Sequence, residues 1–547
     1  MKILIVGGVA GGMSAATRLR RLDEGAEIIV LERSSHVSYA NCGLPYFVGG
    51  VIEEEDTLLL ETPETLHDRF RLDVRVRSEA LSIDRDEKCV SVRDWSSGLE
   101  YTLSYDRLIL SPGASAVVPP LPGIERALTL RTVEDVERIV EQVDRLPESA
   151  VIIGGGFIGV EVAENLVRRG IRTAIVEATS QLLAPLDPEM ASIVAAEMEK
   201  HGVELHLGET VAALTSETVT LASGEQLAAD IVVLAIGVRP ETSLARAAGI
   251  AIGESGGILV DDFNRTSDPS IYAIGDAAEK HDALDTSSTL VPLANIANRQ
   301  GRVVADHING RRIRTVAALG TAIVKVFDVV VAVTGWNEKR LTSQGREFLA
   351  IHTHPKSHAG YYPHAQPMAL KLLVDPRSGA ILGAQGVGTE GVDKRIDVLA
   401  TAIRAGLTAP ELADLELAYA PPFGSAKDPV NMLGYIAENL LSGLVDTAQW
   451  SEVDSLRTRG AQFVDVRTAE EFARGSLPGA INIPVDQLRE RFRELDAVDT
   501  VVNCEVGQRG YVATMLLNEL GCRAVNLDGG YKTWHSSPAA ATLELIS

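Results

Sequence analysis

The sequence predicts a multidomain α/β protein, and three observations lead to this fold class. First, one pattern occurs twice, from residue 3 and from residue 150: a short apolar run, a glycine-rich turn, a helical stretch, and a second apolar run that closes on an acid. Second, residues 321–440 alternate strand and helix patterns, and a new α/β pattern begins at residue 451. Third, 547 residues are too many for one core, so about three or four domains are expected.

The first repeat has the features of a dinucleotide-binding unit. Residues 3–6 enter the glycine turn, a helical pattern continues through Leu22, and the next apolar run ends at Glu32. Amides at such a turn hold a pyrophosphate, and the acid accepts hydrogen bonds from ribose hydroxyls. Val9 departs from the motif, because it stands where the middle glycine belongs. The expected contact residues are Gly7, Gly8, Gly11, Gly12, Glu32 and Arg33.

The second repeat fits the motif fully, with Gly154, Gly156 and Gly159 followed by Glu177. A carboxylate at Glu177 would repel a 2′-phosphate, which favours NADH over NADPH. Either glycine cluster alone is also typical of a tight turn in any α/β protein. Two clusters, each followed by an acid, favour nucleotide binding.

Three further strands end in glycine turns that we expect to line the nucleotide sites, at Gly113, Gly237 and Gly275. The last of these turns continues into Asp276. This acid could hydrogen-bond a ribityl hydroxyl of a flavin, or it could cap the start of a helix.

Cys42 stands alone in the stretch 38–46, about ten residues past the first dinucleotide-binding pattern, with no second cysteine nearby. A lone thiol beside a redox cofactor can accept electrons only by pairing with a sulfur that is distant in sequence. That partner would be a small thiol, a sulfane sulfur or another part of the protein. A thiolate at Cys42 is expected, because a cofactor and helix ends favour the anion.

A second candidate thiol, Cys504, begins a six-residue loop that leads into a helical pattern. Loop amides curling around the sulfur above a helix start would lower its pKa and hold a persulfide anion. The alternative is a buried structural cysteine. The other loop residues are Glu505, Val506, Gly507, Gln508 and Arg509.

Four histidines, His352, His354, His358 and His364, lie close together in the sequence. Their spacing fits no metal template, so we expect a loop there and no metal site.

Composition excludes several classes of partner. A net charge of −24 argues against nucleic acid or an anionic membrane as a general partner. Four cysteines cannot form a disulfide framework, which favours a reducing cytoplasm. The apolar run at the N-terminus is too short for a signal peptide.

Together these motifs resemble known families. The first five-sixths of the chain resembles the flavin-dependent pyridine nucleotide-disulfide oxidoreductases, and residues 38–46 look like those of coenzyme A-disulfide reductases. The last hundred residues resemble a rhodanese domain, through residues 465–467, 478–480 and the Cys504 loop. The combination resembles coenzyme A-disulfide reductase–rhodanese fusions, which include NADH-dependent persulfide reductases. One rhodanese motif departs from the family, because Ser476 stands where a histidine is common.

The resemblance implies two Rossmann-like nucleotide-binding domains, an α+β dimerisation domain and a C-terminal rhodanese α/β domain. The expected bounds are 1–112 with 241–320 for FAD, 113–240 for NADH, 321–440 for dimerisation, 441–450 for a linker, and 451–547 for the rhodanese domain. It implies FAD, NADH and coenzyme A as cofactors or ligands, and a homodimer with no nucleic acid or membrane partner.

The resemblance also implies roles for further residues. Cys42 is the redox cysteine, and Tyr361 or Tyr362 together with Tyr419 would approach it from the other subunit. Without the resemblance, these tyrosines would read as packing residues with satisfied hydroxyls. The residues expected to hold coenzyme A are Ser14, Arg18, Arg21, Ser38, Asn41, Arg71 and Lys427. Of these, Asn41 would also contact the flavin, whereas Ser14, Arg18 and Arg21 share one helical face that could instead be a solvated surface.

The expected activity is NADH-driven, FAD-dependent reduction of coenzyme A persulfide, polysulfide or disulfide at Cys42, with sulfane sulfur carried by Cys504. Three alternatives remain. One is an NADH oxidase or peroxidase that uses Cys42 as a sulfenic acid. Another is a non-catalytic sulfur carrier or redox sensor. The third is an electron-transfer flavoprotein reductase, a function that does not require Cys42.

Overall fold

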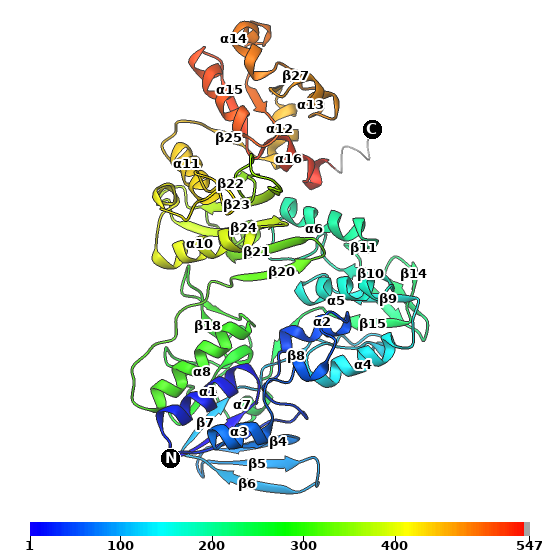
Figure 1. Ribbon diagram of the computed structural model, residues 1–547, viewed down its shortest axis with the longest axis vertical. Helices are drawn as coiled ribbons and strands as arrows, with labels where there is room; N and C mark the ends of the chain where they lie inside the picture. Colours follow the sequence, from blue (N-terminus) through cyan, green and yellow to red (C-terminus); the bar gives the residue numbers. More distant parts are fainter. Residues whose placement is uncertain (541–547) are drawn as a thin grey trace. The chain divides into compact units, whose positions relative to one another are not determined.

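The protein is represented by a computed structural model that describes residues 1–540 (Figure 1). The described residues divide into two compact units. The first comprises Met1–Ser180 and Gly202–Gly320, and the second comprises Gln181–His201 and the described residues from Thr321 onward. In residues 1–540, no helix has the length and apolar character needed to cross a membrane.

The first unit contains two parallel sheets, each built on one of the two repeats. The first sheet has the order β17-β7-β1-β2-β3, and the second has the order β11-β10-β9-β15. In the first sheet, the elements are β1 (Lys2–Val6), α1 (Ala10–Leu22), β2 (Glu27–Leu31), β3 (Asp73–Arg75), β7 (Arg107–Leu110) and β17 (Ile271–Ala273). In the second, they are β9 (Ser149–Ile153), α5 (Phe157–Arg168), β10 (Arg172–Glu177), β11 (Glu204–Leu207) and β15 (Ile231–Leu234).

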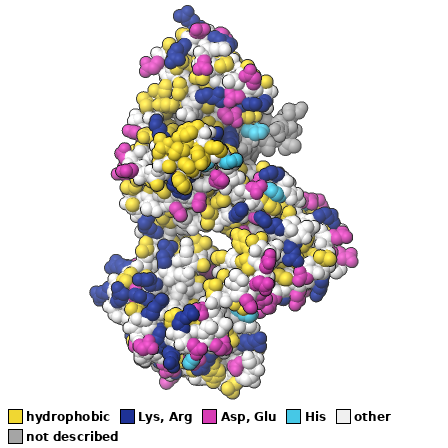
Figure 2. All heavy atoms as spheres, in the orientation of Figure 1, with side chains coloured by type: hydrophobic (Ala, Val, Ile, Leu, Met, Phe, Trp, Pro, Cys, Tyr) yellow, Lys and Arg dark blue, Asp and Glu magenta, His cyan; other side chains and the backbone are white. Residues whose placement is uncertain are grey.

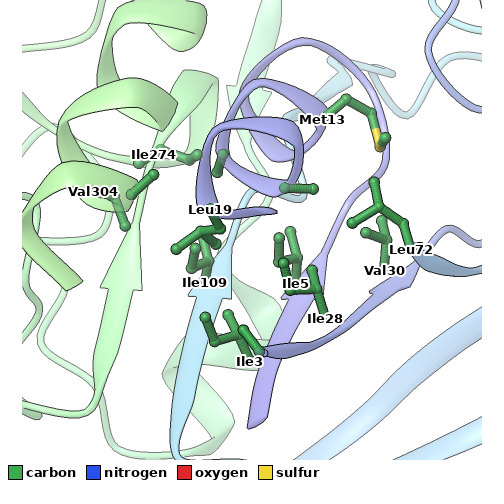
Figure 3. Close-up of a cluster of buried hydrophobic side chains, with 14 of the residues drawn as sticks. Ile3, Ile5, Met13, Leu19, Ile28, Val30, Leu72, Ile109, Ile274 and Val304 are labelled. Atoms are coloured by element: carbon green, nitrogen blue, oxygen red, sulfur yellow. The ribbon is translucent and has the colours of Figure 1, made fainter. Parts of the chain in front are cut away.

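The core of the first sheet lies between its strands and the helices that cover one face. Figure 3 shows Ile5 and Ile109 from the strands directed toward Leu19 of α1, with Val304 of α8 beside them. Helices α1 and α8 (Ala294–Ile308) lie side by side. The nearly continuous burial of β1 and β2, together with the apolar face of α1, positions the first glycine turn at the carboxyl end of β1.

Smaller elements complete the first unit. Two three-stranded antiparallel sheets comprise β4 (Ser78–Asp84), β5 (Cys89–Asp94) and β6 (Glu100–Ser104), and β12 (Val211–Leu214), β13 (Thr218–Leu221) and β14 (Gln226–Ala228). Two strand pairs are β8 (Ala114–Ala116) with β16 (Val238–Pro240), and β18 (Lys280–His281) with β19 (Ser288–Thr289). The remaining helices are α2 (Leu44–Val48), α3 (Pro63–Phe70), α4 (Val133–Val143) and α7 (Ser243–Ala247).

The second unit begins with an antiparallel sheet in the order β20-β21-β24-β23-β22. Its apolar side chains pack with α10 and α11 in one buried cluster, which includes Leu370, Leu372, Ile396 and Leu433. The strands are β20 (Ala322–Val326), β21 (Val329–Gly335), β22 (Leu349–Thr353), β23 (Met368–Val374) and β24 (Ile381–Gly388). The helices are α6 (Pro188–Lys200), α9 (Glu338–Ser343), α10 (Val392–Ala405) and α11 (Pro429–Leu441).

The C-terminal part of the second unit is a parallel sheet in the order β25-β29-β28-β26-β27. Its edge strand β25 (Thr447–Ala448) lies in the segment expected to be a linker and pairs with β29. The other strands are β26 (Gln462–Asp465), β27 (Ile481–Asn482), β28 (Thr500–Asn503) and β29 (Ala524–Leu527). The helices are α12 (Val453–Thr458), α13 (Ala469–Ala473), α14 (Leu488–Arg491), α15 (Gln508–Glu519) and α16 (Gly530–His535).

These sheets and helices confirm the predicted mixed α/β fold class. The loop expected for the histidine cluster is wrong at one position, because His352 lies in strand β22 and is buried. The apolar residues around it pair with β23, so strand register decides the environment of this histidine.

Candidate functional site

The first glycine turn is shaped by close backbone packing. Gly7 has φ +103°, and a Cβ there would lie 2.0 Å from the carbonyl oxygen of Ser111. A Cβ on Gly12 would lie 1.9 Å from the carbonyl oxygen of Gly7, so helix α1 can start this close to the strand only with glycine. Val9 has φ −108°, outside the left-handed region that favours glycine. The departure from the motif therefore leaves the turn intact.

This turn fits the pyrophosphate of a dinucleotide. In the described residues, α1 has no acidic residue in its first turn and no side-chain cap, so its first amides remain open to an anion. Glu32 is fixed at the end of β2 because its carboxylate accepts hydrogen bonds from the amides of Gly8 (2.8 Å) and Ser34 (2.9 Å). A carboxylate has about four acceptor positions, so two remain for ribose hydroxyls.

The second glycine turn repeats this arrangement. Gly154 has φ +110°, and a Cβ on Gly159 would lie 2.0 Å from the carbonyl oxygen of Gly154. Glu177 accepts hydrogen bonds from the amides of Gly155 (2.7 Å) and Thr179 (2.8 Å). By contrast, a Cβ on Gly156 would meet no described atom within 4 Å, so the space beside this residue is open to a ligand.

Cys42 lies in a short 3₁₀ turn, Asn41–Gly43, immediately before α2. The segment is tied to the first glycine turn, because the amide of Ser38 donates a hydrogen bond to the carbonyl of Gly8 (2.8 Å). Ser38 has φ +52°, which places this connection in a strained left-handed conformation. The Cys42 thiol is exposed and lies 3.7 Å from the side-chain oxygen of Asn41.

Acidic side chains surround Cys42. Burial by neighbouring protein atoms and the charges of Glu161 and Asp276 raise the pKa of the Cys42 thiol, and Arg131 opposes them. Burial also raises the pKa of Glu161 to about 6. The expected thiolate would therefore depend on the cofactor and helix ends, because burial and the charges of Glu161 and Asp276 oppose the anion.

Glu161 and Tyr46 were missed by sequence reasoning. The Tyr46 hydroxyl donates a hydrogen bond to the Glu161 carboxylate across 3.1 Å, and it links α2 to α5. Glu161 stands two residues after Gly159, just past the end of the glycine motif and in the first turns of α5. That position was a usable signal, because α5 starts at the nucleotide site.

Asp276 lies in the 3₁₀ turn Gly275–Ala277, and its carboxylate accepts a hydrogen bond from Arg131 at 3.3 Å. This geometry is not the helix N-cap that the sequence also allowed.

Gly113 (φ +75°) and Gly237 (φ +110°) flank the strand pair β8–β16, with no described atom within 4 Å of a Cβ built on either. Arg33 is exposed just past Glu32.

The face of α1 that carries Ser14, Arg18 and Arg21 lies against α8. The Ser14 hydroxyl donates to Asn298 (2.9 Å), and Arg18 donates twice to the fully buried Asp306, at 3.0 and 2.7 Å. Arg21 is exposed. Figure 2 shows Lys and Arg side chains gathering over α8. Sequence reasoning missed α8 because nearly three hundred residues separate the contacting positions.

Two other candidates for coenzyme A binding, Arg71 and Lys427, are exposed. Arg71 is exposed and ends α3 in a left-handed conformation, with φ +50°. Lys427 is exposed and lies over the Tyr435 ring, 5.8 Å from its centroid.

The three candidate tyrosines belong to the second unit. Tyr361 is 78% exposed, Tyr362 is 42% exposed and Tyr419 is 48% exposed. The hydroxyls of Tyr361 and Tyr419 lie 3.0 Å apart. They are therefore not the buried packing residues that the alternative interpretation required.

Cys504 is fully buried at the end of β28, and α15 begins at Gln508 just beyond it. In the described part of the chain, α15 has no side-chain cap and no acidic residue in its first turn. Gly507 has φ +91° and permits the tight curl of the loop. The amides of residues 505–509 can therefore face a sulfur anion.

Two arginines form ion pairs at this loop. Arg467 donates to both carboxylate oxygens of Asp465 and to Glu505 at 2.9 Å. Arg509 binds Glu471 through two hydrogen bonds, of 2.8 and 2.7 Å, and this arginine lowers the pKa of Glu471 to about 2. Both arginines are thus fixed by carboxylates: Arg467 by Asp465 and Glu505, and Arg509, itself a loop residue, by Glu471.

Comparisons with protein families cover most of the chain. Residues 1–301 match "Pyridine nucleotide-disulphide oxidoreductase", residues 321–429 match its dimerisation domain, and residues 449–537 match "Rhodanese-like domain". Coenzyme A disulfide reductase of Staphylococcus aureus (strain bovine RF122 / ET3-1) is 36% identical over 445 residues, which are 80% of this chain and 100% of that protein.

Two solved structures are similar over almost the whole chain. Reduced CoADR-RHD of Bacillus anthracis is 49% identical with a TM-score of 0.96, and the match covers 98% of each chain. An NAD-dependent persulfide reductase from A. fulgidus is 37% identical with a TM-score of 0.93, covering 98% of this chain and 100% of that one.

Proposed function

Because the chain belongs to the pyridine nucleotide-disulphide oxidoreductase family, we propose that it is an NADH-driven flavoprotein that reduces coenzyme A persulfide, polysulfide or coenzyme A disulfide. The observation that carries this proposal is the similarity to CoADR-RHD across both the reductase and the rhodanese parts of the chain. The lone, exposed Cys42 thiol beside the first glycine turn gives the reaction a site.

Each of the two glycine turns would bind a different nucleotide. The turn that ends at Glu32 would hold FAD with Asp276, and the turn that ends at Glu177 would hold NADH. FAD, when bound, supplies the two-electron chemistry that side chains lack. The protein's own contribution is to fix both carboxylates through turn amides and to hold Cys42 at the first turn.

The net reaction balances in electrons and protons. A persulfide R–S–SH takes two electrons from NADH and two protons, one of them from solvent, to give R–SH and hydrogen sulfide. In the disulfide reaction, the same two electrons and two protons convert coenzyme A disulfide into two coenzyme A thiols. Cys42 would alternate between a free thiol and a mixed disulfide with coenzyme A, and Cys504 would carry sulfane sulfur.

Binding of coenzyme A and dimerisation complete the proposal. The basic surface over α8, with Ser14, Arg18 and Arg21, would receive the phosphates of coenzyme A. Arg18 is already paired with Asp306, so Arg21 supplies the freer charge. A homodimer is supported by the match to the dimerisation domain, and by hydrophobic side chains that gather over the second unit in Figure 2. Exposed aromatic residues of that unit include Tyr361, Tyr419, Phe423 and Tyr435.

We also propose the domain bounds expected from the sequence, which are 1–112 with 241–320 for FAD, 113–240 for NADH, 321–440 for dimerisation, 441–450 for a linker and 451–547 for the rhodanese domain. A cytoplasmic location is also proposed, and it is supported by four cysteines that all carry free thiols in the described residues. The alternatives of an oxidase, a peroxidase or a non-catalytic sulfur carrier are not favoured, because the similarity to a persulfide reductase extends through the rhodanese domain.

Two serine variants test the proposal separately. Cys42→Ser should retain FAD, measured by its absorbance, and lose NADH consumption with coenzyme A persulfide. Cys504→Ser should retain NADH-dependent reduction of coenzyme A disulfide and lose sulfur transfer from thiosulfate to cyanide. Full persulfide turnover by Cys42→Ser would reject the assigned role of that thiol.

A further inference from the structure

A buried ion network joins the dimerisation sheet to the rhodanese domain within the second unit. His352 of β22 lies between two carboxylates: its Nδ1 is 2.6 Å from Asp528, and its Nε2 is 2.9 Å from Glu189 of α6. The side chains of His352, Glu189 and Asp528 are only 2%, 1% and 5% exposed. The backbone amide of His352 also donates to both oxygens of Asp528, at 3.2 and 3.1 Å.

The geometry of the ring requires a cation. A neutral imidazole carries one N–H, so one of its nitrogens would present a lone pair to a buried carboxylate. With an imidazolium, both nitrogens donate, and both carboxylates are satisfied. Because Asp528 has no other ionic partner among the described residues, its charge is compensated by His352.

Asp528 immediately precedes the segment that packs on the Cys504 loop. A Cβ on Gly529 would lie 2.7 Å from the Cβ of His352, and a Cβ on Gly530 would lie 2.5 Å from the carbonyl oxygen of Cys504. The amide of Tyr531 then donates to that same carbonyl at 2.7 Å. Four consecutive residues, Asp528 to Tyr531, therefore connect the histidine to the sulfur-bearing loop through close backbone contacts that leave no room for side chains at Gly529 and Gly530.

We propose that His352, as an imidazolium between Asp528 and Glu189, is a positioning residue for sulfur transfer at Cys504. It acts from the dimerisation domain by fixing Asp528 and, through Gly529 and Gly530, the backbone of the sulfur loop. This proposal rests on the sulfur-transfer role of Cys504 proposed above.

The surrounding charges set the pH range. Burial alone would lower the pKa of His352, but Asp528 and Glu189 outweigh burial and the repulsion by Lys371, and they raise it to about 9 from 6.5. The stabilisation is therefore complete below pH 6.5 and is lost as the pH rises through about 9. His354, two residues along the same strand, contacts Thr533 at 2.7 Å, and burial lowers its pKa to about 3.

His354 therefore provides a matched control, because it is an uncharged histidine at the same interface. We would compare the full-length wild type, His352→Gln and His354→Gln for sulfur transfer from thiosulfate to cyanide between pH 6 and pH 10. At pH 7, His352→Gln should reduce kcat/KM on the order of tenfold, as expected for losing a charged hydrogen bond. The ratio of wild type to this variant should approach one as the pH passes 9, whereas the ratio for His354→Gln should not vary with pH.

Hydrogen exchange at pH 7 provides a readout independent of activity. Amides of residues 504–510 should exchange faster in His352→Gln and at the wild-type rate in His354→Gln, whose own hydrogen bond goes to Thr533 of α16. Asp528→Asn should reproduce the effect if His352→Gln does not fold. Unchanged exchange in both His352→Gln and Asp528→Asn would overturn the proposal, as would a pH-independent activity ratio for His352→Gln. Absence of sulfur transfer in the wild type would reject only the function proposed for Cys504, and exchange would then decide the role of His352.

Discussion

Removing the positive charge of Lys371 should strongly destabilise the second unit. Its side chain is fully buried, and its Nζ lies 2.9 Å from Asp187, 2.5 Å from Glu189 and 2.7 Å from Glu338. Burial raises the pKa of Glu189, but the charge of Lys371 and the hydrogen bond of His352 outweigh burial and hold that pKa well below its usual range. Lys371→Met keeps most of the side-chain volume and removes the charge.

The expected loss is large because the substitution removes the cation that Asp187 and Glu338 share, while Glu189 keeps His352. Removing one member of a buried ion pair costs about 3–5 kcal/mol, and a lysine shared by three carboxylates places the expectation at the upper end of that range. For a unit of about 250 residues, each kcal/mol lowers the melting temperature by about 2–4 °C, so a decrease on the order of 10 °C follows.

The pH dependence has a definite sign. In Lys371→Met, Glu338 loses the charge that opposes the effect of its burial, so its folded-state pKa rises further above its unfolded value, whereas Glu189 keeps His352. The variant therefore gains stability as the pH falls, and its deficit relative to wild type should be greatest near pH 7–8 and smaller near pH 5. Adding Asp187→Asn, which removes a fully buried carboxylate charge paired with Lys371, should recover part of the loss.

Melting of the full-length protein, followed by circular dichroism between pH 5 and pH 8, measures these effects. Lys325→Met is the matched control, because Lys325 is an exposed lysine on strand β20 of the same sheet and should be close to neutral. The reasoning is refuted if Lys371→Met melts within about 2 °C of wild type at pH 7, or if its deficit grows as the pH falls.

Two further predictions concern the first unit. Glu161→Gln should lower the pKa of the Cys42 thiol, because the Glu161 charge raises it. The pKa can be measured from the pH dependence of alkylation of the Cys42 peptide, followed by mass spectrometry. A midpoint of that pH dependence that stayed constant or rose would contradict the prediction. Gly159→Ala should lower both melting temperature and NADH affinity, because its Cβ would meet the carbonyl of Gly154, whereas Gly156→Ala should weaken NADH binding without changing the melting temperature. Equal melting temperatures for these two variants would contradict the assigned packing.

Sequence reasoning reached the features that local patterns encode. Both glycine turns were located, with Glu32 and Glu177 at the ends of their second strands, because the backbone approach that each turn requires admits only glycine. The isolation of Cys42 was likewise visible without coordinates.

The residues missed are those whose meaning depends on distant contacts. Glu161 influences Cys42 only because α5 packs against α2, the helix that follows the 3₁₀ turn carrying the thiol, and Asp306 pairs with Arg18 only because α8 lies along α1. No local periodicity records either pairing.

The sequence by itself determined the order of the α/β units, the nucleotide turns and the two candidate thiols, because glycine conformation, hydrophobic period and cysteine position are local properties. Only the tertiary structure decided the setting of His352. Strand β22 buries this residue, and packing against α6 and β29 sets it between Glu189 and Asp528, more than 160 residues away on either side. A carboxylate that is distant in sequence affects the pKa of a histidine only when the fold brings the two side chains together and excludes water between them. For this reason the residues next to His352 in the sequence could not predict its charge.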